Sequence, residues 1–274
     1  MSAEKLGHEV RVVDYLRCYM NITSKKPTVI FRGEKLEDYD AVITRIGASY
    51  TYYGAAVVRQ FEMAGLYTIN RSKAITRSRD KLRSLQILAR EGIGLPVTGF
   101  ANHTADIDGM IDTVEGIPLV IKLLEGTQGK GVVLAETKKA ASSVLSAFRQ
   151  LKANILVQEF IKEVERGDKR IILLNGEIVG SINRVPQKGE SRSNMHVGGK
   201  PEKTILTKQD KFICKEISQS LKDKGLYFVG VDIIGEYITE INVTSPTGIR
   251  EIKSYSSIII EEMFWDFIEK KLNV

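Results

Sequence analysis

The sequence has few of the features that mark membrane, secreted or metal-cluster proteins. Its 274 residues include two cysteines, Cys18 and Cys214, and three histidines without metal-ligand spacing. No apolar run reaches the ~18–20 residues needed to cross a bilayer. The opening residues contain no apolar segment of a secretory signal. These absences predict reduced thiols, no membrane partner and a cytoplasmic location.

Charge and composition exclude fewer classes of function than these absences do. The net charge is +6, with 43% hydrophobic and 27% charged residues, which is typical of a globular protein. A positive excess suits nucleotide phosphates, acidic substrates or nucleic acid. The basic residues are dispersed, however, and no RNA-binding aromatic motif accompanies them, which weighs against a nucleic-acid partner.

Changes of pattern divide the chain into three parts, because no repeat or Pro/Gly/Ser linker does so. Residues 1–75 predict a small βα unit with a parallel sheet. Residues 76–157 predict a helix over 76–95, N-capped by Ser78, and then alternating strands and helices. Residues 158–274 predict a strand-rich block with helices over 208–224 and 256–272. The expected fold class is therefore α/β and α+β.

The first part lacks an element that its pattern requires. Residues 2–7 predict the end of a helix with Gly7 as its C-cap, and residues 8–14 predict the strand that follows. A βαβ unit needs a strand before such a helix. We therefore expect the first strand of this domain to be missing.

Three oxygen-bearing side chains lie in a predicted hairpin near the C-terminus. Glu240 and Asn242 are two residues apart on one strand, so they share a face. A two-residue turn would put Asp232 on the opposite face, whereas a three-residue turn at 234–236 would put all three side chains together. The three together suit Mg²⁺, and the alternative is a solvent-facing strand side with acids by chance.

Glycines crowd the loop between two predicted strands. Gly126, Gly129 and Gly131 follow directly after the apolar strand that carries Lys122. The spacing is neither that of a Walker A motif nor that of a Rossmann fingerprint. The backbone N–H groups of such a loop can close over phosphates, and Lys122 and Lys81 would add positive charge. The alternatives are a gatekeeper lysine at a sheet edge and a lysine exposed at a helix start.

The order of these features resembles the ATP-grasp superfamily. RCYMNI, YDAVITRIG, SRDKLRSLQILAREGIGLPVTG, LVIKLLEGTQGKGVVLAET and ILVQEFIKE are similar to RimK-type ligases, which add glutamate to the C-terminus of a ribosomal protein. From about residue 186, GLYFVGVDIIGEYITEINVTSPTGIREI is more similar to bacterial glutathione synthetases. The resemblance implies a pre-ATP-grasp domain over 1–75, a lid subdomain over 76–157 and a catalytic subdomain over 158–274.

The resemblance also implies a role for each candidate residue. ATP would be held by Lys81, Lys122, Gly126, Thr127, Gln128, Gly129, Gly131, Gln158, Glu159, Phe160, Ile161 and Asp168, with Glu159 and Asp168 on the nucleoside side. Mg²⁺, or Mn²⁺ in its place, would be bound by Asp232, Glu240 and Asn242. The substrate carboxylate and its acyl phosphate would be bound by Arg170, Arg184, Arg192 and Asn194. The rest of the substrate would face Arg45, Ser245 and Thr247.

The implied reaction is ATP-dependent amide formation through an acyl phosphate. RimK-type addition of L-glutamate to a protein or peptide C-terminus, for example that of a ribosomal protein, comes first because the longer matched region is RimK-like. Glutathione synthesis from γ-glutamylcysteine and glycine is the alternative, and a nucleotide-binding protein without ligase activity is a third. Related ligases often form tetramers, so we expect a homo-oligomer, either a dimer or a tetramer.

Overall fold

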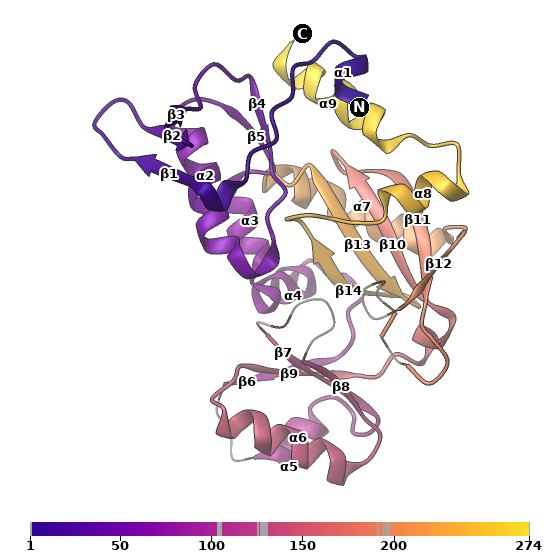
Figure 1. Ribbon diagram of the computed structural model, residues 1–274. Helices are drawn as coiled ribbons and strands as arrows, with labels where there is room; N and C mark the ends of the chain where they lie inside the picture. The colour runs from indigo at the N-terminus through magenta and orange to yellow at the C-terminus, as the bar shows by residue number, and fades with distance from the viewer. Residues whose placement is uncertain are drawn as a thin grey trace.

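The computed structural model describes residues 2–102, 106–124, 126, 131–190, 192–193, 195 and 198–273, with the side chain of residue 48 left out. Figure 1 shows an N-terminal region beside a large sheet, and a smaller sheet with two helices below both. The two chain ends lie close together, because α1 (Ser2–Lys5) packs against α9 (Ile260–Leu272). No described helix is both long and apolar enough to cross a bilayer.

Residues 1–75 form two small sheets instead of the single parallel sheet that the pattern predicts. The first is antiparallel and contains β1 (Cys18–Asn21), β2 (Thr28–Phe31) and β3 (Glu34–Lys35). The second is a parallel pair, β4 (Ala41–Ile43) and β5 (Tyr67–Ile69). The predicted strand over 8–14 is wrong, because this segment pairs with no strand among the described residues and an unpaired strand is not stable. Helix α2 (Thr51–Met63) packs on both sheets.

Two helices replace the single helix predicted over 76–95. They are α3 (Ser72–Arg79) and α4 (Lys81–Arg90). Asp80 separates them, with extended backbone and a carboxylate that accepts the N–H of Arg83 at 3.0 Å. The predicted Ser78 cap is therefore wrong: Asp80 caps α4, since a carboxylate accepts a first-turn N–H and suits the positive end of the helix dipole.

The small sheet is antiparallel and has the order β6-β9-β7-β8. Its strands are β6 (Thr98–Ala101), β7 (Leu119–Leu123), β8 (Val132–Ala135) and β9 (Ile155–Glu159). Helices α5 (Ile107–Asp112) and α6 (Lys138–Gln150) cover one face. Because side chains alternate along a strand, Leu119 and Ile121 are buried under these helices while Val120 and Lys122 point to the opposite face.

The large sheet has the order β12-β11-β10-β13-β14. Its strands are β10 (Asp168–Leu174), β11 (Glu177–Val185), β12 (Lys200–Glu202), β13 (Phe228–Ile234) and β14 (Tyr237–Asn242). A short helix, η3 (Lys162–Arg166), leads into it from the small sheet. The predicted Asn175-Gly176 hairpin turn is confirmed, because both residues have positive φ (51° and 79°), as a type I′ turn requires.

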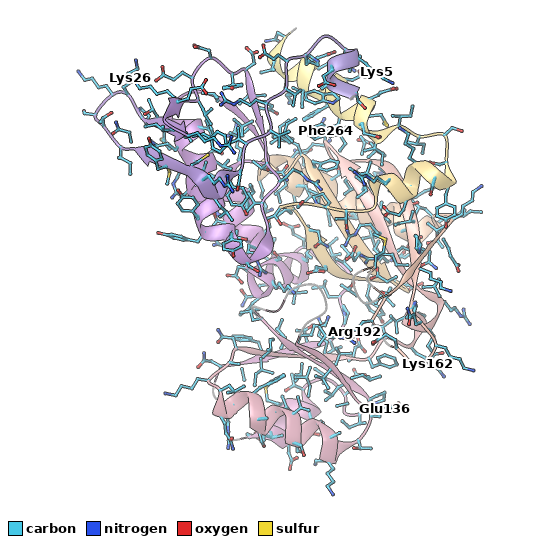
Figure 2. All side chains as sticks on the ribbon, in the orientation of Figure 1. Lys5, Lys26, Glu136, Lys162, Arg192 and Phe264 are labelled. Carbon is cyan, nitrogen blue, oxygen red and sulfur yellow. The ribbon has the colours of Figure 1, made fainter. Side chains whose placement is uncertain are left out.

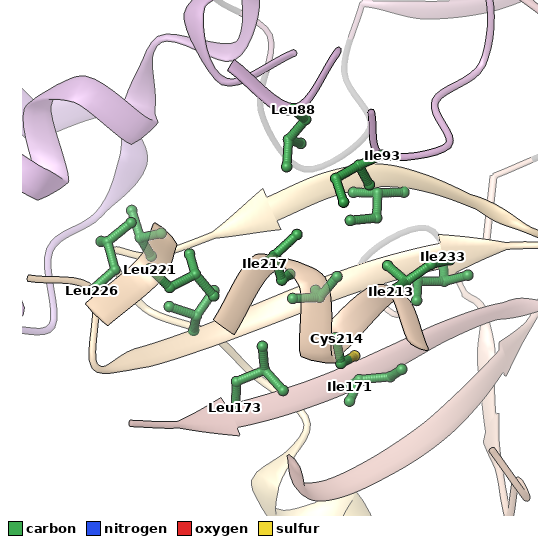
Figure 3. Close-up of a cluster of buried hydrophobic side chains, with 14 of the residues drawn as sticks. Leu88, Ile93, Ile171, Leu173, Ile213, Cys214, Ile217, Leu221, Leu226 and Ile233 are labelled. Carbon is green, nitrogen blue, oxygen red and sulfur yellow. The ribbon is translucent and has the colours of Figure 1, made fainter. Parts of the chain in front are cut away.

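Helices bury both faces of the large sheet, which explains its nearly continuous apolar strands. Helices α8 (Ile249–Tyr255) and α9 pack on one face, to which α9 contributes Phe264, labelled in Figure 2. The ring centroid of Phe264 lies 5.0 Å from that of Phe228, in an edge-on arrangement. Helix α7 (Lys208–Asp223) packs on the other face through Ile213, Cys214 and Ile217 (Figure 3). The C-terminal helix begins at 260 and not at the predicted 256, and α8 occupies part of the loop predicted before it. Both cysteines are free and buried.

Candidate functional site

A cavity of about 500 Å³ lies between the small and large sheets. Its wall includes Val120 and Lys122 of β7, Gln158 of β9 and Arg170 of β10. The strand β14 and the start of α4 close other sides. A cavity of this volume, lined by apolar side chains and a few convergent polar groups, suits a small molecule of nucleotide size.

The connection from the small sheet to the large sheet borders this cavity. Gln158, Glu159, Phe160 and Ile161 all line it. The Gln158 amide donates to Thr98 Oγ1 at 2.9 Å, and the Glu159 carboxylate accepts the N–H of Val97 at 2.8 Å. Both side chains are therefore held by β6 and the residue before it, and residues 158–161, the hinge between the two sheets, form a defined wall.

Two lysines face the cavity from different elements. Lys122 Nζ donates to the side-chain oxygen of Gln158, which is neutral. Burial lowers the pKa of Lys122 to about 8, helped by nearby Lys81 and opposed by Glu240 and Asp168. Lys81 Nζ lies 3.1 Å from the Gly126 carbonyl oxygen and 3.4 Å from Glu240 Oε1. Lys81 thus lies at the start of the glycine loop, and both cations face the same cavity, as phosphate binding would require.

The predicted oxygen-donor trio meets on one face of the β13–β14 hairpin, for a reason that simple alternation along the strands does not predict. The turn contains two residues, Gly235 and Glu236, which is the alternative that by simple alternation would put Asp232 on the face opposite Glu240. A β-bulge compensates for the short turn: Ile233 pairs with Ile238 and Asp232 with Glu240, which leaves Thr239 as the extra residue. The bulge reverses the parity of the ladder and puts Asp232 opposite Glu240.

Asp232 is held by arginines as well as by its neighbour in the trio. Arg170 donates through Nε and Nη2 to both of its oxygens, and Arg184 Nη2 lies 2.9 Å from Oδ2. The Asn242 amide donates to the same Oδ2 at 3.2 Å. Burial would raise the pKa of Asp232, but the two arginines outweigh it and lower the pKa to about 2.

Asp168 belongs to the same buried group and also lines the cavity. Its Oδ2 accepts from Arg184 and from Ser193 Oγ at 2.9 Å. Burial and the nearby Asp232 raise the pKa of Asp168 to about 6, against the opposing effect of the arginines. Among the described residues, Asp168 Oδ1 and Arg184 Nε are buried without hydrogen-bond partners.

The remaining candidates are divided between the cavity and its surroundings. Arg192, which lies between the two sheets in Figure 2, lines the cavity and binds Glu190 through Nη2 at 2.6 Å. Ser245 and Thr247 line it too. Arg45 does not: it lines a separate cavity of about 220 Å³ and donates to the Pro246 carbonyl at 3.2 Å.

Some predicted phosphate-loop residues are outside the cavity wall or outside the described residues. Gly126 lines the cavity, whereas Gly131 does not and accepts the N–H of Leu123 through its carbonyl at 2.9 Å. Predictions for four residues fall outside the described part of the chain: Thr127, Gln128, Gly129 and Asn194.

Several residues that shape the site were missed by the sequence analysis. Thr98 holds the Gln158 amide, Ser193 donates to Asp168, and Thr239 forms the bulge. Ser193 stands between two predicted site residues, so its position was a usable signal. Thr98 and Thr239 carry no such signal, because their roles depend on which strands pair.

The donor chemistry of the trio fits Mg²⁺ or Mn²⁺. Within the described residues there is no group of three His, Cys, Asp or Glu that could hold a metal ion by itself. The trio offers two carboxylates and one amide, and Glu240 and Asn242 line the cavity directly. Mg²⁺ typically uses one or two carboxylates and completes its shell with water and substrate phosphates, so this set is sufficient.

Comparison with known proteins agrees with this geometry. Residues 1–75 match the family described as RimK PreATP-grasp domain, and residues 88–257 match the prokaryotic glutathione synthetase ATP-grasp domain. A "Probable alpha-L-glutamate ligase" of Maridesulfovibrio salexigens is 53% identical over 268 residues, covering 96% of this chain and 87% of the relative. Its namesake in Aliivibrio fischeri is 51% identical over 273 residues, covering 98% of this chain and 89% of the relative.

A solved structure shares the fold at low sequence identity. The ATP-grasp ligase PsnB, complexed with minimal precursor, Mg and ADP, has a TM-score of 0.72 at 16% identity, over 100% of this chain and 92% of that one. This structure confirms the predicted fold, and the family matches and relatives confirm the predicted superfamily. The glutathione synthetase match begins at residue 88, well before residue 186, where the sequence predicts that the resemblance changes. The chain belongs to the ATP-grasp carbon–nitrogen ligases, in the family of the probable alpha-L-glutamate ligases.

Proposed function

We propose that this protein is an ATP-dependent ligase that adds L-glutamate to the C-terminus of a protein or peptide. One observation carries the proposal: the cations Lys81 and Lys122 and the donors Glu240 and Asn242 line the same cavity. A nucleotide between them would meet positive charge on one side and metal ligands on the other. The glutamate substrate is supported by relatives named probable alpha-L-glutamate ligases.

The nucleotide would lie between the two sheets. Its phosphates would contact Lys81, Lys122 and the backbone at Gly126, and its base would lie along the hinge residues 158–161. The glycine loop would close over the phosphates, since glycine lets backbone N–H groups approach an anion closely. ATP-grasp ligases bind ADP and Mg in the same fold, as the PsnB structure illustrates.

The metal would be held by Asp232, Glu240 and Asn242. When bound, Mg²⁺ or Mn²⁺ neutralises phosphate charge and so lets a second anion approach the γ-phosphoryl group. Lys81, 3.4 Å from Glu240 Oε1, would contact both the acid and the phosphates. The carboxylates, the cations and the glycine loop thus serve one purpose, which is to bring two anions together.

The reaction would proceed in two balanced steps. A carboxylate oxygen of the acceptor attacks the γ-phosphorus, the bond to the β-phosphate breaks, and ADP leaves with the acyl phosphate formed. The amine of glutamate then attacks the acyl carbon, loses a proton and expels phosphate to leave an amide. Arg170 and Arg192, which line the cavity, would stabilise the negative charge of the acyl phosphate. Exclusion of water by the closed loop would protect this intermediate.

The acceptor would enter near the loop after β14. Ser245 and Thr247 of this loop line the cavity. A peptide acceptor, such as the C-terminus of a ribosomal protein, is consistent with the bound precursor in the PsnB structure. A homo-oligomer, a dimer or tetramer, remains our expectation.

Glutathione synthesis is the second candidate, and one observation favours it. Residues 88–257 match the ATP-grasp domain of prokaryotic glutathione synthetase, which includes most of the cavity wall. The same two steps would then join γ-glutamylcysteine to glycine.

An ADP-release screen tests both candidates. We expect turnover that requires L-glutamate together with a peptide bearing a free C-terminal carboxylate, and a product heavier by one glutamate residue in mass spectrometry. A peptide with an amidated C-terminus is the matched control and should give no turnover. Turnover only with γ-glutamylcysteine and glycine would replace the first candidate with the second.

A further inference from the structure

We propose that Arg170 and Arg184 keep Asp232 from binding a free divalent cation, so that the metal enters this site only together with the nucleotide. The inference rests on the proposed function and adds to it an order of binding. It also gives the two arginines a positioning role beside Asp232, in addition to the contact with the acyl phosphate proposed for Arg170.

Four buried charged side chains form one connected group around Asp232. Asp168, Arg170, Arg184 and Asp232 are 7%, 5%, 3% and 3% exposed. Arg170 donates to both oxygens of Asp232, and Arg184 joins Asp232 to Asp168. The formal charges of the four therefore cancel before any metal is present. A divalent cation added to this group would leave an excess of two positive charges in a buried place, which is unfavourable.

The fold fixes Arg170 in this arrangement. A Cβ at Gly230 would lie 3.2 Å from Arg170 Cδ and 3.1 Å from Pro246 Cβ, which is tighter than normal contact, so glycine lets the arginine stem pack closely here. Gly248, with a φ of 110°, also lies near the stem: a Cβ there would be 3.6 Å from Arg170 Cγ. The Thr247 carbonyl accepts from Nη1 at 3.2 Å. Packing and hydrogen bonds thus both hold Arg170 beside Asp232, in a slot formed by Gly230, Pro246 and Gly248.

The rest of the trio does not restore a negative charge. Glu240 faces Lys81 at 3.4 Å, and Lys122 contributes a further cation to the same cavity. Across these groups, four cations face three carboxylates. A free Mg²⁺ or Mn²⁺ is therefore repelled, whereas a metal carried by a triphosphate arrives with negative charge that offsets both the metal and the lysines.

Manganese binding measured by EPR, without any turnover, tests the inference. We expect the wild-type protein to bind Mn²⁺ at least about tenfold more weakly without nucleotide than with AMPPNP. In Arg170→Met, the buried group gains a net negative charge, so nucleotide-free Mn²⁺ binding should tighten by about tenfold or more. Arg184→Met gives a second, independent variant with the same expected direction if the first fails to fold, and circular dichroism monitors folding in both.

Two control variants separate the local effect from net charge. Arg59→Met removes a charge from the exposed face of α2 and should leave Mn²⁺ binding unchanged. The double variant Arg170→Met/Asp232→Asn removes both partners and should bind nucleotide-free Mn²⁺ no more tightly than the wild type. The inference would be overturned by tight nucleotide-free Mn²⁺ binding in the wild type, or by folded arginine variants whose Mn²⁺ affinity does not rise. Neither result would contradict the proposed ligase function. Failure to bind AMPPNP at all would instead overturn the proposed function, and the inference with it.

Discussion

The two sheets that border the cavity treat buried charge in different ways. The small sheet presents one lysine, Lys122, whose hydrogen-bond partner Gln158 is neutral, and burial lowers the pKa of that lysine to about 8. The large sheet buries acids and arginines that pair with one another, and two arginines lower the pKa of Asp232 to about 2 against the effect of burial. A cation without an acid partner is available to an anionic ligand, whereas paired charges mainly fix geometry.

The largest effect on ligand binding should come from a substitution in the small sheet. We expect Lys122→Ala to weaken ADP binding by about 10- to 100-fold, because a charge-assisted hydrogen bond contributes roughly 1.5–3 kcal/mol. Isothermal titration calorimetry measures the change. Lys139→Ala, an exposed lysine at the start of α6, is the matched control and should bind ADP like the wild type. Equal affinity in Lys122→Ala and wild type would contradict the assignment of the phosphate site.

A change in the large sheet should act on the metal instead of the nucleotide. In Glu240→Gln one carboxylate is lost, so we expect the Mg²⁺ concentration for half-maximal ADP release to rise about tenfold. ADP binding without metal should not weaken, since the variant also removes negative charge near Lys81. Metal titrations of ADP release and metal-free calorimetry measure the two parts. An unchanged Mg²⁺ requirement would break the proposed division between the sheets.

The pH dependence of nucleotide binding should identify Lys122. The lysine loses its charge as pH rises through about 8, so ADP affinity should fall by up to about tenfold between pH 8 and pH 9. Lys122→Met should show a flat profile in this range. The effect of Lys122 on the free energy of unfolding has the opposite sign. Its pKa in the folded protein, about 8, lies below the ordinary 10.5, so between these values the unfolded chain binds more protons than the folded one. The free energy of unfolding therefore rises with pH in this range. If ADP affinity fell with pH in Lys122→Met as it does in the wild type, Lys122 would not be the group responsible for the pH dependence.

The smallest effect concerns the slot that holds Arg170. In Gly230→Ala the new methyl would lie 3.1–3.2 Å from Pro246 and from the arginine stem, which is tighter than normal contact. We expect the free energy of unfolding to fall by about 1 kcal/mol, with the fold retained, because the arginine stem can shift slightly. Urea unfolding measures the loss. A variant as stable as the wild type would mean that the slot is looser than the described contacts suggest.

Local patterns predicted the small sheet and the lysine faces, because alternation is a property of one strand. The face of Lys122 follows directly from its apolar neighbours Leu119 and Ile121. The order of lysine, glycine loop, hinge and acids was sufficient to suggest the superfamily, which the comparisons confirm.

Features that depend on pairing between strands could not be read in the same way. Residues 8–14 alternate like a strand but have no pairing partner in the described structure, so no strand forms. The bulge at Thr239 decides whether Asp232 and Glu240 meet, and no local signal marks it. The engagement of Asp232 by Arg170 joins residues 62 positions apart. Such contacts need the ladder register, which one sequence does not supply.

The central claim is that one cavity holds a metal–nucleotide complex between a lysine side and an acid side. A crystal structure of the protein with AMPPNP and Mn²⁺ tests it most directly, because anomalous scattering locates the metal without ambiguity. We predict the β- and γ-phosphates within hydrogen-bond distance of Lys81 and Lys122, and the Mn²⁺ peak beside Glu240 and Asn242. A nucleotide bound elsewhere, or a metal far from these donors, would contradict the account.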